Sequence, residues 1–201
     1  MTSFEGTQQT AGFRYSNPSR RNHKNEGHRI CMVSDFFYPN MGGVEMHIWC
    51  LSQCLIRRGH KVIVVTHAYE GRQGIRVMTN GLKVYYLPLT VVYDQVIFPT
   101  LYGFLPLFRN ILIRERISII HGHQSASVLT NECIIYARTM GYHACYTDHS
   151  LFGFSDIGSI HINKALEITL SDIDHVICVS NTCRENLSLR ASLHPMMVKL
   201  K

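Results

Sequence analysis

The sequence predicts an α/β protein with an open, mostly parallel sheet and helices on both of its faces. From residue 29 onward, short runs rich in Val, Ile and Tyr alternate with segments whose apolar residues recur at helical spacing. The run KVIVVT, at residues 61–66, is apolar almost throughout, which is typical of a strand buried on both faces of a parallel sheet. This alternation indicates βαβ units and therefore a Rossmann-like architecture.

The first half of the chain supplies three strands and two helices. Strands are expected at residues 29–34, 61–66 and 82–87. The helix after the first strand is indicated by apolar residues at Val44, Ile48, Leu51 and Leu55, which lie on one helical face. Gly59 is expected to end that helix, since glycine readily adopts the left-handed conformation found there. A second helix is expected at residues 101–116, although Pro106 interrupts its first half.

The second half repeats the alternation. Strands are expected at residues 117–120, 144–147 and 175–179, and helices at 125–140, 162–171 and 181–191. Two of these strands run directly into polar segments, His121-Gly122-His123 and Asp148-His149-Ser150. Because ligands of open parallel sheets bind beyond the carboxyl ends of the strands, the loops to inspect are 35–45, 121–124, 148–156 and 180–182.

Composition narrows the class of protein. With 46% hydrophobic and 17% charged residues, the chain is globular from residue 29 to 201, whereas the polar residues 1–28 are expected to be a disordered tail. That tail has no apolar core typical of a secretory signal, and no run of about 18 apolar residues follows. The net charge of +6 suits either ordinary surface residues or an anionic partner. The sequence contains no dense block of Lys and Arg of the kind that would indicate nucleic-acid binding.

The cysteines indicate free thiols in a reducing compartment. There are seven of them, an odd number, and no CxxC pair is present. Buried thiols explain Cys31, Cys145 and Cys178, which fall inside apolar strands. A structural zinc site is therefore not expected.

Two adjacent glycines, Gly42 and Gly43, lie where the first strand gives way to a helix. Bare backbone at a helix N-terminus can bind a phosphate through its unpaired N–H groups and the helix dipole. The alternative is a plain turn that needs positive φ. The dinucleotide pattern GxGxxG is absent, and the second strand ends in Thr66-His67-Ala68 with no acidic residue directly at its tip for a ribose. Glu70 lies nearby, so the pattern weighs against NAD without excluding it.

Three histidines fall at predicted strand ends. His121 and His123 are two residues apart in a strand and so face the same side, and His149 follows the next strand. A hydroxyl acceptor, a phosphate or a metal would each suit them. A metal hydrolase would also need carboxylate ligands, and only Asp148 is close, so no metal is assigned. Asp148 either accepts from a ligand hydroxyl or bonds local backbone in a turn; sequence neighbours cannot form a Ser/His/Asp triad with it.

The segment FLPLFRNILIRER, at residues 104–116, mixes apolar residues with Arg109, Arg114 and Arg116. Two interpretations stay open. The segment is either a basic amphipathic surface for anionic lipid or an ordinary core-facing helix with solvated arginines.

Five motifs in order, SDFFYPNMGGVE, RRGHKVIVVTH, IIHGHQS, TDHSLFGF and VICVSN, resemble the N-terminal domain of retaining glycosyltransferases of family 4, which have the GT-B fold. The first and fourth most resemble the family of catalytic subunits of phosphatidylinositol N-acetylglucosaminyltransferase, which begins GPI-anchor biosynthesis. The resemblance spans roughly residues 30–198.

The resemblance implies transfer of GlcNAc from UDP-GlcNAc to phosphatidylinositol, with retention at the anomeric carbon and no obligatory metal or other cofactor. It implies a membrane complex with other subunits on the cytosolic face of the endoplasmic reticulum, with this chain peripheral at the membrane surface. The resemblance implies that three residues are catalytic, namely His123, Asp148 and His149. It implies that the donor phosphates are bound by Gly42 and Gly43, and that the acceptor is bound by Asp35, Glu45, His121 and Ser150.

One departure from the family is large. Family members continue into a second Rossmann-like domain that holds most of the nucleotide sugar and an E-x7-E carboxylate pair, and then into a membrane anchor. This sequence ends at Lys201, near the expected hinge. It is therefore expected to be the acceptor-side domain, residues 29–201, and to lack transferase activity alone. The alternative is a non-catalytic module that joins the transferase complex or binds lipid.

Overall fold

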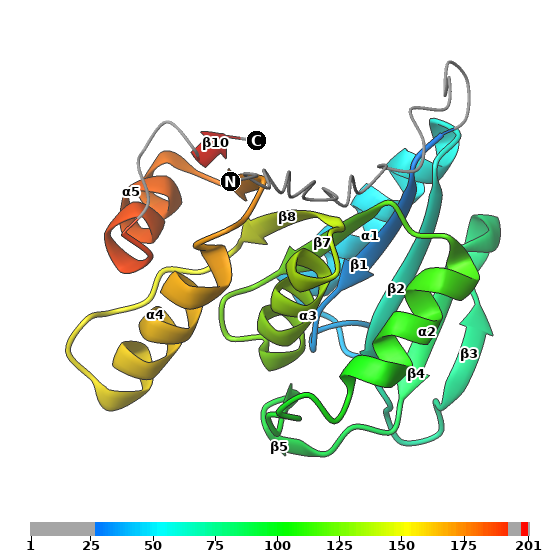
Figure 1. Ribbon diagram of the computed structural model, residues 1–201, viewed down its shortest axis with the longest axis horizontal. Helices are drawn as coiled ribbons and strands as arrows, with labels where there is room; N and C mark the ends of the chain where they lie inside the picture. The colour runs from blue at the N-terminus through cyan, green and yellow to red at the C-terminus, as the bar shows by residue number, and fades with distance from the viewer. Residues whose placement is uncertain (1–26, 193–197, 201) are drawn as a thin grey trace, which may run out of the picture.

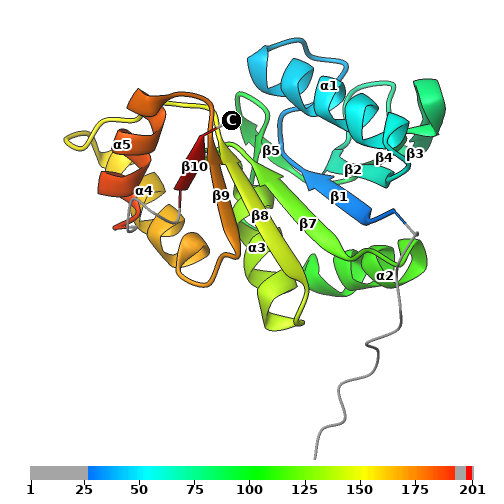
Figure 2. The ribbon, with the colours of Figure 1, turned by 90° about the horizontal axis from the view of Figure 1, so that it is seen from above.

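The computed structural model describes residues 27–192 and 198–200, and most of the predicted N-terminal tail lies outside them. One eight-stranded sheet runs through the molecule in the order β10-β9-β8-β7-β1-β2-β4-β3, with helices packed against it (Figures 1 and 2). Every neighbouring pair is parallel except β3 and β4, which are antiparallel at one edge. The predicted fold class, a mostly parallel Rossmann-like sheet, is confirmed.

The sheet strands are β1 (Arg29–Val33), β2 (Lys61–His67), β3 (Gly74–Val77), β4 (Lys83–Leu87), β7 (Ile119–His123), β8 (His143–Asp148), β9 (His175–Cys178) and β10 (Val198–Leu200). A separate hairpin joins β5 (Val91–Tyr93) to β6 (Val96–Ile97). The helices are α1 (Gly43–Arg57), α2 (Leu105–Glu115), α3 (Val128–Thr139), α4 (Ile157–Leu170) and α5 (Asn181–Arg190), with a 3-10 turn, η1 (Thr79–Gly81).

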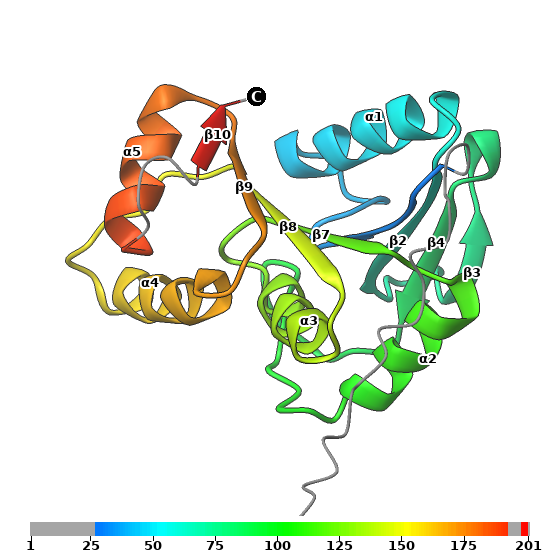
Figure 3. The ribbon, with the colours of Figure 1, turned by 45° about the horizontal axis from the view of Figure 1, so that its top comes forward.

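Helices cover both faces of the sheet, as predicted (Figure 3). On one face, Ile48 of α1 packs with Met32 of β1 and Val64 of β2. On the other face, α2 and α3 cover the alternate residues of the same strands, and α3, α4 and α5 cover β8 and β9. This alternation of buried side chains explains why β1 and β2 are apolar at nearly every position.

The predicted elements differ from the observed ones mainly at their ends. The strand predicted at 117–120 extends through His123, so both histidines of the His-Gly-His motif lie within β7. Helix α4 begins at Ile157, five residues before its predicted start, because Asp156 caps it by accepting from the backbone N–H of Ser159 at 2.8 Å. Strands β3, β5, β6 and β10 were not predicted.

Candidate functional site

Three elements bring histidines together at the carboxyl end of the sheet. His123 ends β7, His149 follows β8, and His47 reaches them from α1. Nδ1 of His123 lies 3.2 Å from Nε2 of His149. The ring of His47 lies edge-on to that of His149, with ring centroids 4.6 Å apart. The structure thus brings together the two histidines predicted to be catalytic and adds a third.

His47 was missed in the sequence. Its signal is its position between Val44 and Leu51, at spacings of three and four residues, on the apolar face of α1. A histidine on the face that packs against the sheet can reach a ligand at the strand ends, and that reasoning would have found it.

The pattern His-Gly-His follows from packing on the two faces of β7. His121 and His123 share the face that α1 covers, while Gly122 faces α3. A Cβ on Gly122 would lie 2.6 Å from Cγ2 of Thr130 and 2.8 Å from Cδ1 of Ile134. Helix α3 therefore packs directly on the backbone of β7, and only glycine fits between the two histidines.

His121 is buried beside His123 on the same face of β7. It is 8% exposed, and its Nε2 lies 2.7 Å from Oγ1 of Thr147 on β8. Burial, together with the nearby His47, lowers the pKa of His121 to about 4. Its ring is therefore neutral at physiological pH, and it lies beside the tilted ring of His123, with ring centroids 4.2 Å apart. This geometry suits a positioning residue better than the direct acceptor contact expected from the sequence.

The two glycines open α1. Gly42 is the N-cap in extended conformation, with φ −152°, and neither it nor Gly43 is among the described glycines with positive φ. The alternative of a turn that needs positive φ is therefore wrong. A Cβ on Gly42 would lie 2.5 Å from Oε2 of Glu45, whereas a Cβ on Gly43 would meet nothing within 4 Å. Open space thus adjoins Gly43, at the positive end of the helix dipole.

Glu45 belongs to the same helix start rather than to an open acceptor surface. It is 5% exposed, and its carboxylate folds back over Gly42 in the first turn of α1. A carboxylate there interacts favourably with the helix dipole. The predicted acceptor contact by Glu45 is therefore not supported by its position.

Asp35 requires a correction. Its side chain is fully buried, and its carboxylate accepts from the backbone N–H groups of Val128 at 3.0 Å, Leu129 at 3.3 Å and Ile97 at 3.3 Å. Two of these donors are the first N–H groups of α3, so Asp35 caps that helix from a distance of more than 90 residues in sequence. An acceptor molecule has no access to this carboxylate. Asp35 therefore connects the 35–45 loop to the β5–β6 hairpin and to the start of α3.

Asp148 requires the same kind of correction. Its carboxylate is buried and accepts from the Tyr146 hydroxyl at 2.9 Å and from Nη1 of Arg190, also buried, at 3.3 Å. Burial raises the pKa of Asp148, and Arg190 opposes that rise. Asp148 thus joins β8 to α5 instead of lining the histidine cluster. Ser150, in contrast, lies beside the cluster, where its hydroxyl accepts from the Gln124 amide at 2.6 Å.

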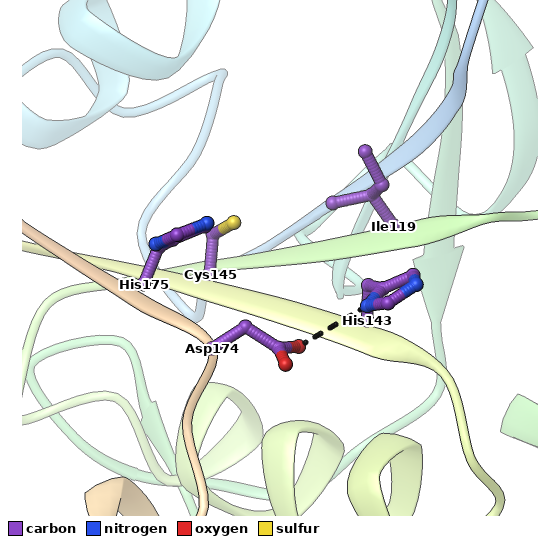
Figure 4. Close-up of a pocket in the computed structure, with 5 residues that line it drawn as sticks. All are labelled: Ile119, His143, Cys145, Asp174 and His175. Carbon is purple, nitrogen blue, oxygen red and sulfur yellow. Dashed lines mark ion pairs between the residues drawn. The ribbon is translucent and has the colours of Figure 1, made fainter.

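A hollow of about 350 Å³ lies near the amino-terminal ends of β8 and β9 (Figure 4). It is lined by Ile119, His143, Cys145, Asp174 and His175. His143 and Asp174 pair across it at 3.5 Å. Ligands of parallel sheets bind at the opposite, carboxyl ends of the strands, so this hollow is distinct from the histidine cluster.

Solved structures share this fold. Sucrose-phosphate synthase from Thermosynechococcus elongatus matches with a TM-score of 0.67 and 17% identity, over 86% of this chain and 47% of that chain. Anabaena Alr3699/HepE, solved in complex with UDP, matches with a TM-score of 0.57 and 12% identity, over 86% of this chain and 43% of that chain. The fold is therefore the N-terminal Rossmann-like half of a GT-B structure, as predicted.

Sequence comparisons identify the relatives. The model of the family PIGA (GPI anchor biosynthesis) matches residues 67–156. A phosphatidylinositol N-acetylglucosaminyltransferase subunit of Homo sapiens is 59% identical over 173 residues, and the gpi3 subunit of Schizosaccharomyces pombe is 60% identical over 169. These matches cover 86% and 84% of this chain but 36% and 37% of those proteins. The predicted resemblance to these transferase subunits is confirmed, and the chain spans just over a third of their length.

Proposed function

We propose that this chain forms the acceptor side of a retaining glycosyltransferase that moves GlcNAc from UDP-GlcNAc to phosphatidylinositol, the first step of GPI-anchor biosynthesis. The observation that carries the proposal is the convergence of His47, His123 and His149 beside the open start of α1. Imidazoles that accept protons then adjoin a helix N-terminus that favours phosphate. Identity of 59% to a human protein named for this transfer supports the same reaction.

Each group has a role in the proposed reaction. His123 and His149 contact the acceptor hydroxyl of the inositol, where a neutral imidazole nitrogen accepts a hydrogen bond and helps the hydroxyl lose its proton. The backbone of Gly42 and Gly43 borders the donor diphosphate, which gains negative charge as the sugar leaves. Ser150 contacts the acceptor, and His121 keeps the ring of His123 in place. Asp35 and Asp148 position the elements that carry these groups.

The setting is a membrane surface, in a complex with other subunits on the cytosolic face of the endoplasmic reticulum. Within the described residues, none of the helices combines the length and apolarity needed to cross a bilayer. An exposed apolar surface nevertheless lies on the β5–β6 hairpin and on the segment that leads into α2. We define it as the apolar rim; its members, all more than 60% exposed, are Val92, Tyr93, Phe98, Leu101 and Tyr102.

The apolar rim is linked to the loop after β1 and to the start of α3 through Asp35, which accepts from the backbone N–H groups of Ile97 in β6 and of Val128. It continues onto the outer face of α2, where Leu107 and Ile113 are exposed beside Arg109 and Arg114. Aromatic and aliphatic side chains flanked by arginines suit the interface of an anionic bilayer. In this proposal the rim rests on the membrane that holds the phosphatidylinositol acceptor.

The proposal is tested by a graft. The residues of the human relative that match this chain are replaced by those of the chain, and the graft is expressed in cells that lack the relative. We expect GPI-anchored proteins to return to the cell surface. His123→Ala should abolish the return. His161→Ala should leave it unchanged, because His161 is exposed on α4, away from the cluster. A graft that is stably expressed but restores nothing would refute the proposal.

A turnover assay, together with the graft, separates the alternative, a non-catalytic module that joins the complex or binds lipid. The whole chain is incubated with UDP-GlcNAc and phosphatidylinositol, alone and with the native complex. A module would lower the turnover of the complex by competing with the native catalytic chain, and the graft would fail. Turnover by the chain alone would contradict the expectation that it is catalytically incomplete.

A further inference from the structure

We propose that His47, His123 and His149 form a three-imidazole site for a divalent transition metal, with zinc as the preferred ion. One ligand atom from each of these histidines lies within 4.8 Å of the other two. Sequence patterns alone do not assign a metal here, since carboxylate ligands are lacking and His47 does not fall at a strand end. The inference deepens the proposed function of the same site, but it is measured on the chain alone.

The spacing of one nitrogen pair already fits a coordinated ion. Zinc binds imidazole nitrogen at about 2.0–2.1 Å in tetrahedral geometry, which places two ligand nitrogens about 3.3 Å apart. Nδ1 of His123 and Nε2 of His149 are 3.2 Å apart. The ligand atom of His47 lies within 4.8 Å of the other two ligand atoms. It must therefore move closer to them by about 1.5 Å at most to reach the tetrahedral spacing. It is half-buried, as is His149, so side-chain rotation supplies that movement.

The surroundings hold the ligands in place. His123 is fully buried at the end of β7, and its backbone N–H donates to Oγ1 of Thr130 at 3.3 Å. His47 sits in the second turn of a fifteen-residue helix. Two of the three ligands thus come from rigid elements, and the third follows directly from β8. Preorganised ligands of this kind lower the cost of binding an ion.

The ligand set selects among ions. Three neutral imidazoles suit zinc, cobalt, nickel and copper, whereas magnesium and calcium prefer oxygen ligands. Three protein ligands also leave the fourth tetrahedral position for water or a substrate oxygen. A bound ion would use the lone pairs with which His123 and His149 contact the acceptor hydroxyl. Zinc is therefore expected to compete with the acceptor.

The test is a titration of the whole, untagged chain with Co²⁺, which reports tetrahedral nitrogen ligation by visible absorption, followed by displacement with Zn²⁺. We expect one equivalent of Co²⁺ to give the tetrahedral band and Zn²⁺ to remove it, while Mg²⁺ has no effect. His47→Ala should weaken Co²⁺ binding at least tenfold. Circular dichroism should show that this variant remains folded, since His47 is half-buried on a surface helix.

Two matched controls exclude adventitious binding. His60→Ala removes a histidine that stacks on His28 at 5.6 Å, and Cys54→Ser removes an exposed thiol; both should bind Co²⁺ like the wild type. Equal binding by the wild type and by His47→Ala and His149→Ala would overturn the metal site. A failed graft with intact Co²⁺ binding would refute the transferase alone. A working graft without Co²⁺ binding would refute the metal site alone.

Discussion

Asp35 shows how a single buried carboxylate can decide the shape of a site without touching its ligand. Replacing it with Asn keeps the size of the side chain but sets an amide NH₂ group against backbone N–H donors. One or more of the bonds from Val128, Leu129 and Ile97 is then lost. We expect Asp35→Asn to lower the free energy of unfolding by about 1–3 kcal/mol, measured by urea denaturation. Asp172→Asn, at an exposed carboxylate, should cost less than about 1 kcal/mol.

The penalty for Asp35→Asn should also depend on pH. Burial raises the pKa of Asp35 from 3.8 to about 7, although the hydrogen bonds from its three backbone N–H donors lower that pKa. Between these values the folded state binds more protons than the unfolded state, so the contribution of Asp35 to stability falls as pH rises from about 4 to 7. The penalty should therefore be largest near pH 4 and shrink toward pH 7. A penalty that does not change over this range would contradict the raised pKa.

His121 should give the opposite slope. Its folded pKa of about 4 lies below its ordinary value of 6.5, so between them the unfolded state binds the extra proton. Stability from this group is complete above pH 6.5 and is lost as pH falls toward 4, by about 3 kcal/mol. The difference between wild type and His121→Gln, measured across this range, isolates the slope from that of Asp35. Parallel curves for the two proteins would show that His121 is not buried in its neutral form.

These two residues also show where prediction from sequence stops. The histidines at the ends of β7 and β8 were predictable, because parallel strands place their carboxyl ends together. The burial of Asp35 was not, because its partners Val128 and Leu129 lie more than 90 residues away and no local pattern marks them. A carboxylate that caps a remote helix and one that binds a ligand look the same in sequence.

At the scale of elements, the joint between β8 and α5 rests on the buried pair of Asp148 and Arg190. Asp148→Asn leaves the Arg190 charge buried without its partner, which costs about 3–5 kcal/mol. Glu167→Gln breaks the exposed pair with Lys164 and should have little effect on stability, because solvent screens that pair. Thermal and urea unfolding would measure both. If Asp148→Asn keeps full stability but abolishes activity in the graft, Asp148 is catalytic and its structural assignment fails.

The start of α1 offers a cleaner separation of stability from function. Because a Cβ on Gly43 meets nothing within 4 Å, Gly43→Ala should leave unfolding unchanged to within about 1 kcal/mol. The methyl group would occupy the open space proposed for the donor diphosphate, so activity of the graft should fall about tenfold or more, equivalent to about 1.4 kcal/mol. Unchanged activity would show that the diphosphate does not approach Gly43.

Elements were predictable in proportion to their burial. β1, β2 and β4 are apolar because helices cover both faces, and their ranges were predicted to within one residue at each end. β3 and β5 are exposed at every residue, so they lack the apolar signature of a strand and were missed. The early start of α4 has a signal in the sequence, because Asp156 is a residue type that commonly caps helices. The apolar periodicity of the first turn is weak, and the expected start at residue 162 relied on that periodicity alone.

At the scale of the whole molecule, the positive net charge and the apolar rim should act together on a bilayer. Phe98 and Leu101 are 61% and 79% exposed, and burying such side chains in a bilayer contributes about 1.5–3 kcal/mol each. The net charge of +6 adds attraction to anionic lipid. We expect the chain to sediment with vesicles that contain phosphatidylinositol, and less with vesicles of phosphatidylcholine alone. The double variant Phe98→Ser and Leu101→Ser should reduce vesicle binding at least tenfold.

The matched control lies on another part of the surface. Leu189 of α5 is 73% exposed and lies outside the rim, so Leu189→Ser should bind vesicles like the wild type. Equal loss in both variants would mean that exposed apolar area in general, and not the rim, drives binding. Added salt distinguishes the remaining contributions, because it screens the arginines of α2 but leaves apolar burial intact. Residual binding at high salt that disappears in the rim variant would place the membrane against β5, β6 and the start of α2.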